Sequence, residues 1–129
     1  REKIIANASD LMVVIADPSK QVDVLGAFPL PVEVTPFGFT ITAKKVYDAL
    51  REAGVNRPKI DVRKGRDGQP LVTDGGNYIL DCACSVIPDA PYTAQLLAAI
   101  PGVVEHGLFI GIARTVIIGG DDGASIFEY

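Results

Sequence analysis

The sequence is poor in the residues that usually hold a metal or a disulfide framework. Its 129 residues include two cysteines, one histidine, one methionine and no tryptophan. The absence of a second cysteine pair argues against a zinc site. Cys82 and Cys84 alternate in a predicted strand, where their Cα atoms would lie about 6.6–6.8 Å apart, the outer limit for a disulfide. We therefore predict two reduced core cysteines.

The sequence also has no long apolar run and no excess of basic charge. Its longest apolar runs, such as residues 11–16, are far shorter than the roughly 20 residues that span a bilayer. The first residues lack the features of a signal peptide. Twelve basic against 16 acidic side chains give a net charge of −4, which argues against nucleic-acid and membrane-surface binding. We expect a cytoplasmic protein with neither partner.

The sequence does contain apolar patterns typical of strands that alternate along the chain with patterns typical of helices. Apolar residues make up 48% of the chain, which excludes disorder. Between residues 30 and 110 the pattern predicts a ferredoxin-like β-α-β-β-β-α-β domain, with an extra strand in its middle hairpin. The predicted strands span residues 32–35, 59–63, 71–73, 78–84 and 103–110, and the predicted helices span residues 40–53 and the stretch after Asp89, an N-cap.

The flanking segments do not fit into that domain. Residues 2–8 predict a helix, and the apolar run at 11–16 predicts a parallel strand buried on both faces. Residues 115–119 predict another strand, which continues through a turn into a terminal hairpin. Buried parallel strands need neighbours and covering helices, and this chain offers too few of either. Since the chain also lacks an initiator methionine, we expect a fragment or a processed product of a larger α/β protein.

Lys20 is the strongest candidate for binding a ligand. It lies just past the predicted strand at 11–16, and open α/β sheets bind ligands at that end of their strands. A lysine there can hold a phosphate or another anion, although a solvated loop lysine fits the position equally well. Glu2 could act as a base, but its place near a helix start favours a charge that complements the helix dipole. For Asp17 the position favours capping of the following turn over contact with a sugar hydroxyl.

The other polar motifs favour structural roles. Residues 63–66 (RKGR) predict a solvated hairpin tip that protects a sheet edge. His106 is predicted to be a structural histidine, and residues 121–123 lack the further ligands of a calcium loop. No G-x-G-x-x-G or P-loop pattern occurs. From the residues alone, the sequence yields a small-anion site near Lys20.

Several of the predicted turns resemble, in order and spacing, the type A ribose-5-phosphate isomerases. The resembling pieces are residues 1–6 (REKIIA), 15–21 (IADPSKQ), 28–34 (FPLPVEV), 72–77 (VTDGGN), 79–81 (ILD), 100–104 (IPGVV) and 107–109 (GLF). The resemblance implies a Rossmann-like catalytic domain formed in part by residues 1–29 and by return strands at 111–129. Residues 30–110 would form the smaller ferredoxin-like domain, which contributes to contacts in a homodimer or homotetramer.

The resemblance also implies an activity. The family interconverts D-ribose 5-phosphate and D-ribulose 5-phosphate in the non-oxidative pentose phosphate pathway, through an enediolate and without metal or organic cofactor. Glu2 matches the family's proton-transferring glutamate, and Lys20 matches a substrate-binding lysine that steadies negative charge. The family's T-G-S/T, D-G-A-D and K-G-G-G loops have no counterpart in this sequence. We therefore expect the isolated chain to have little or no turnover.

Two non-catalytic hypotheses remain beside the isomerase. The chain could be a ferredoxin-like assembly module or a stable proteolytic core, because half of a sheet leaves apolar surface for association. A small-molecule-sensing domain is a further hypothesis, and it rests on fold analogy alone.

Overall fold

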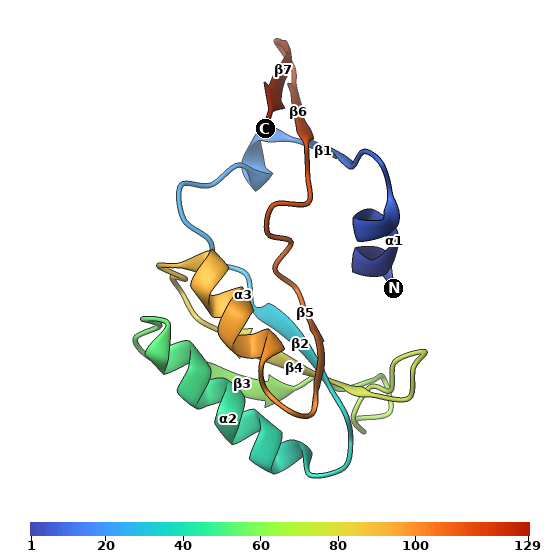
Figure 1. The fold of residues 1–129 in the computed structure, drawn as a ribbon, viewed down its shortest axis with the longest axis vertical. Helices are drawn as coiled ribbons and strands as arrows, with labels where there is room; N and C mark the ends of the chain where they lie inside the picture. Colours follow the sequence, from blue (N-terminus) through green and yellow to red (C-terminus); the bar gives the residue numbers. More distant parts are fainter. The chain divides into compact units, whose positions relative to one another are not determined.

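The computed structural model describes all of residues Arg1–Tyr129, and it divides into two compact units. Unit 1 comprises Arg1–Asp23 and Phe109–Tyr129, and unit 2 comprises Val24–Leu108. Together they contain three α-helices and two separate sheets, a mixed α/β fold (Figure 1). None of the helices is both long enough and apolar enough to span a bilayer.

Unit 2 is a four-stranded sheet with both of its helices on one side (Figure 1). The elements follow one another as β2 (Leu30–Val34), α2 (Phe39–Glu52), β3 (Lys59–Val62), β4 (Tyr78–Ala83), α3 (Ala90–Ala98) and β5 (Val103–His106). Their order in the sheet is β3-β4-β2-β5, and every neighbouring pair is antiparallel. The chain therefore crosses over a neighbouring strand twice. α2 connects β2 to β3 past β4, and α3 connects β4 to β5 past β2.

The core of the molecule lies between this sheet and its helices. In β2 the burial alternates, so that Leu30, Val32 and Val34 face the helices while Pro31 and Glu33 lie on the other face. Val46 and Leu50 from α2 are fully buried. Cys82 and Cys84 belong to the same core and are both free thiols, which confirms the prediction of reduced core cysteines.

The predicted strand at 71–73 is wrong, and with it the β-α-β-β-β-α-β order. The observed order of unit 2 has one strand fewer, and only an isolated bridge joins Lys64 and Pro70. Thr73 forms a turn instead. Its hydroxyl donates to Glu33 Oε1 at 2.7 Å and accepts the N–H of Asn77 at 3.1 Å. Side-chain bonds of this kind compete with a strand ladder.

Unit 1 brings the two ends of the chain into one sheet. It contains α1 (Glu2–Ala8), β1 (Val13–Ala16), the 3₁₀ turn η1 (Pro18–Lys20), β6 (Thr115–Gly120) and β7 (Gly123–Glu128). β1 pairs with β6 in parallel, in a register that sets Val13 opposite Thr115, and β7 completes an antiparallel hairpin with β6. The predicted helix at 2–8, the parallel strand and the terminal hairpin are therefore confirmed.

The predicted burial of the first strand on both faces is wrong for this chain. Ile15 at the centre of β1 is 75% exposed, and Val13 is 45% exposed. The sheet order is β1-β6-β7, so β1 has a single neighbouring strand and leaves one edge unpaired. A parallel strand becomes buried only when strands flank it and helices cover it.

Candidate functional site

Unit 1 holds both residues that sequence analysis selected for chemistry. Glu2 is the first residue of α1, and Lys20 is the last residue of η1, the turn that follows β1. Both side chains are exposed, and the structure forms no ion pair between them.

Glu2 carries a carboxylate that stays ionised at neutral pH. Its side chain is 92% exposed, and Oε2 lies 3.7 Å from the amino group of Arg1. A hydrogen bond from its own backbone N–H, together with that positive charge, lowers the pKa of Glu2 below its usual value. An ionised carboxylate can accept a proton, which is the property that a general base needs.

Local turn chemistry determines where Lys20 lies. The Asp17 carboxylate accepts the backbone N–H of Ser19 at 2.7 Å and also its hydroxyl. These bonds lower the pKa of Asp17, and they confirm its predicted role as the cap of the turn. The Lys20 N–H donates to the Asp17 carbonyl at 3.1 Å, which closes the turn around Pro18.

The end of β6 lies against the same turn. A Cβ at Gly120 would come within 3.3 Å of Pro18 Cγ, so a side chain there would crowd the turn. Because β1 and β6 are parallel, their carboxyl ends lie at one edge of the sheet, and Lys20 follows that edge. This is the place where open α/β sheets bind ligands.

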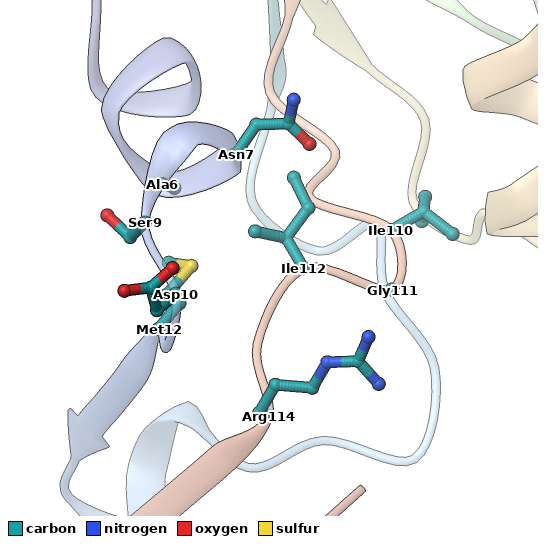
Figure 2. Close-up of a pocket in the computed structure, with 9 residues that line it drawn as sticks. All are labelled: Ala6, Asn7, Ser9, Asp10, Met12, Ile110, Gly111, Ile112 and Arg114. Atoms are coloured by element: carbon teal, nitrogen blue, oxygen red, sulfur yellow. The ribbon is translucent and has the colours of Figure 1, made fainter.

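A second feature of unit 1 is a polar hollow that sequence reasoning missed. It has a volume of about 210 Å³, and Figure 2 shows its lining contributed by the end of α1, the residues before β1 and the segment leading to β6. The lining residues are Ala6, Asn7, Ser9, Asp10, Met12, Ile110, Gly111, Ile112 and Arg114. Neither Glu2 nor Lys20 belongs to it. No local motif could have found it, because its two walls lie about 100 residues apart in the chain.

The remaining candidates have structural partners. His106 Nδ1 accepts the N–H of Leu108 at 3.2 Å, as expected of a structural histidine. Arg63 is not part of a solvated tip, since its guanidinium donates to Asp81 at 2.7 and 3.0 Å. No three histidine, cysteine, aspartate or glutamate side chains lie close enough together to hold a metal ion.

Comparison with known proteins identifies the family. Residues 1–123 match the family model described as ribose 5-phosphate isomerase A (phosphoriboisomerase A). The chain belongs to this family. It is 63% identical over 129 residues to the ribose-5-phosphate isomerase A of Maricaulis maris strain MCS10, and 57% identical over 128 residues to that of Rhodopseudomonas palustris strain HaA2. Each alignment covers 99% of this chain but 55% of the relative, so the chain spans about half their length.

Solved structures show the same likeness. A ribose 5-phosphate isomerase A from Methanocaldococcus jannaschii is similar at 35% identity with a TM-score of 0.83. A D-ribose-5-phosphate isomerase in complex with phospho-erythronic acid is similar at 32% identity with a TM-score of 0.87. Both alignments cover 99% of this chain and 54% of the solved one.

Proposed function

We propose that this chain forms the carboxyl-terminal part of an isomerase that interconverts D-ribose 5-phosphate and D-ribulose 5-phosphate. Membership in the ribose 5-phosphate isomerase A family is the observation that carries the proposal. The relative bound to phospho-erythronic acid supports a sugar phosphate as the substrate class. A homodimer or homotetramer and a cytoplasmic location belong to the same proposal, and both come from the family resemblance.

Glu2 is the proposed proton carrier. After the sugar ring opens, its carboxylate removes the proton from C2 of the aldose and returns it to C1, and an enediolate carries the negative charge between the two steps. The proton of the C2 hydroxyl passes to the C1 oxygen, so that C2 becomes the carbonyl carbon and C1 carries a hydroxyl. One carboxylate can serve both steps, since the proton it takes up is the proton it gives back. The exposure of the Glu2 side chain is compatible with this role, because no part of this chain covers its carboxylate.

Lys20 is the proposed anion-binding residue. Its exposed side chain follows the carboxyl edge of β1 and β6, where it can meet a phosphate or the developing negative charge. The ammonium contributes as a positioned charge, whose stabilising effect is largest where water is excluded. In this chain the site is open to solvent, so Lys20 alone gives weak binding.

The two units fit the proposed architecture. Unit 1 supplies part of a Rossmann-like catalytic domain, in which the unpaired edge of β1 would receive further parallel strands. For unit 2 we propose a ferredoxin-like small domain. The β-α-β-β-α-β order and the antiparallel β3-β4-β2-β5 sheet support that assignment.

The deciding experiment is an isomerase assay on mass-verified protein. The 13.7 kDa chain is assayed alone and after combination with the portion of the Maricaulis maris relative that it does not cover. We expect little or no turnover alone, turnover in the combination, and its loss in Glu2→Gln. Asp122→Asn, in the exposed turn after β6, is the matched control and should retain turnover. A folded but inactive wild-type combination contradicts the proposal, and fast turnover by the chain alone contradicts its dependence on the missing portion.

A second candidate is an assembly module without catalysis. Large apolar side chains favour it, since Phe37 is 95% exposed, Phe28 is 81% exposed and Ile15 is 75% exposed. Size-exclusion chromatography with a hydrophobic dye tests this candidate directly. A monomer that binds no dye contradicts it, whereas a stable oligomer that lacks turnover in every combination would favour it over the isomerase.

A further inference from the structure

The helix that carries Glu2 has little to hold it. α1 is seven residues long, none of its residues is buried, and Arg1 at its N-cap makes no side-chain capping bond. An isolated helix of this length is only marginally stable in water, because the unfavourable free energy of nucleation exceeds the stabilisation from its few backbone hydrogen bonds. At its end, the Ser9 hydroxyl donates to the Ile5 carbonyl at 2.6 Å. The first turn, where Glu2 lies, is also contacted from outside the helix.

One such contact joins Lys3 to Phe109. The Lys3 Nζ lies over the Phe109 ring, 5.1 Å from its centroid, which is within the range of a cation–π interaction. Lys3 is the residue next to Glu2 in the first turn of α1. Phe109 opens the return segment, which we define as residues 109–114, between β5 and β6.

The return segment is itself tied to the chain just after α1. The Arg114 N–H donates to the Met12 carbonyl at 3.1 Å, and Thr115 begins the parallel register opposite Val13. Between these points, Ile112 points toward the end of α1 across the polar hollow, which Ile110 also lines (Figure 2). One segment therefore contacts α1 near both of its ends, and its Phe109 contact reaches the first turn.

The contact at Lys3 bears on the direction of Glu2. Successive residues of an α-helix are rotated by about 100°, so a contact that favours one orientation of the first turn also favours one direction for Glu2. We propose that Lys3 and Phe109 are positioning residues for Glu2, and that their contact aims its carboxylate at the C1 and C2 carbons of the sugar. This inference rests on the proposed isomerase function.

The test compares four substitutions in the combination of this chain with the remaining portion of the Maricaulis maris relative. Lys3→Met removes the cation and Phe109→Leu removes the ring, whereas Lys3→Arg and Phe109→Tyr keep both partners of the interaction. We expect kcat to fall by about fivefold in Lys3→Met and in Phe109→Leu, with KM changed by less than about twofold. The conservative variants should retain at least half of the wild-type kcat. Lys44→Met, at an exposed position of α2, is the matched control.

The double variant separates positioning from general damage. If the two residues act through one contact, Lys3→Met combined with Phe109→Leu lowers kcat no further than either change alone. Effects that multiply in the double variant, or an undiminished kcat in Phe109→Leu, overturn the proposal. An effect confined to KM also overturns it, because that pattern marks uniform substrate binding.

A readout without turnover keeps this proposal distinct from the proposed function. In the 129-residue chain, the Lys3 Cε protons should show an upfield ring-current shift in the NMR spectrum that disappears in Phe109→Leu. A missing shift in the wild-type chain overturns the contact and the proposal with it. If the shift is present but the wild-type combination has no turnover, the isomerase function fails, and the positioning role fails for that reason alone.

Discussion

Arg63 and Asp81 form a bidentate ion pair across the face of the unit 2 sheet that the helices leave uncovered. Arg63 Nη2 lies 2.7 Å from Asp81 Oδ1, and Nε lies 3.0 Å from Oδ2. The side chains are 38% and 28% exposed, so solvent screens the pair only in part. The hydrogen bonds to Asp81 raise the pKa of Arg63 above its usual value. A planar guanidinium is suited to this geometry in a way that an ammonium is not.

The pair predicts different costs for two substitutions. Arg63→Lys keeps the charge but loses the bidentate bond, and we expect it to lower the free energy of unfolding by about 0.5–1 kcal/mol. Arg63→Met leaves Asp81 without its partner and should cost about 1–2 kcal/mol. Urea denaturation of both variants measures the difference. Equal stability of Arg63→Lys and the wild type would show that the second hydrogen bond contributes nothing.

The buried thiols are predicted to be unreactive in the folded chain. Burial, with smaller effects from Cys84 and Asp81, raises the pKa of Cys82 to about 12 from an ordinary value of 9.0. Burial also raises the pKa of Cys84. Since the thiolate is the reactive form, a disulfide reagent at pH 8 should label both cysteines only after guanidinium unfolds the chain. Rapid labelling without denaturant contradicts this.

The same shift predicts a dependence of stability on pH. The unfolded thiol of Cys82 ionises near 9.0, whereas the folded thiol stays protonated until about 12. The unfolded state therefore binds fewer protons between these values, and stability falls as the pH rises through that window. Cys82→Ala should flatten this part of the stability profile, even though its cavity lowers stability at every pH.

Gly26 is predicted to tolerate no side chain. Its φ is +129°, and a Cβ there would lie 2.7 Å from the Cα of Val86. We expect Gly26→Ala to lower the free energy of unfolding by more than about 2 kcal/mol, because strain and backbone overlap add. Gly68→Ala is the control, since its φ is also positive at +76° but nothing lies within 4 Å. It should cost about 1 kcal/mol, and equal losses in the two variants would contradict the overlap.

The turn before Lys20 predicts an NMR titration. The pKa of Asp17 should lie below its ordinary value of 3.8, because the hydroxyl and the backbone N–H of Ser19 both donate to its carboxylate. Ser19→Ala removes the hydroxyl and keeps the N–H, so the pKa should rise part of the way back. An unchanged pKa in Ser19→Ala would mean that the hydroxyl bond does not form in solution.

The sequence predicts those elements whose signals are local. The amphipathic period predicts residues 40–53 as a helix, and α2 spans Phe39–Glu52. Asp89 is predicted as an N-cap, and its carboxylate accepts the Tyr92 N–H at 3.0 Å. Both depend on residues within a few positions of each other, where spacing and capping rules hold.

The features that the sequence does not predict depend on distant partners. The local pattern predicts a strand at Thr73, because the hydrogen bond to Glu33 that holds Thr73 in a turn joins residues 40 positions apart. The apolar run at 11–16 correctly predicts a parallel strand, but its exposure depends on how many strands flank it, which the run itself does not encode. The same holds for the Lys3 and Phe109 contact and for the polar hollow, whose members come from opposite ends of the chain.

The pairing of β1 with β6 has a consequence for how this chain is synthesised and folds. Val13 finds its partner Thr115 only after all of unit 2 has been synthesised, because every strand of unit 2 lies between the two residues, at positions 30–106. Long-range parallel pairing forms slowly, because the chain loses the entropy of closing a large loop before any stabilising contact forms. Unit 2 can therefore fold while translation continues. Until β6 is synthesised, the edge of β1 that pairs with it has no partner, and at this stage chaperone binding or aggregation competes with folding.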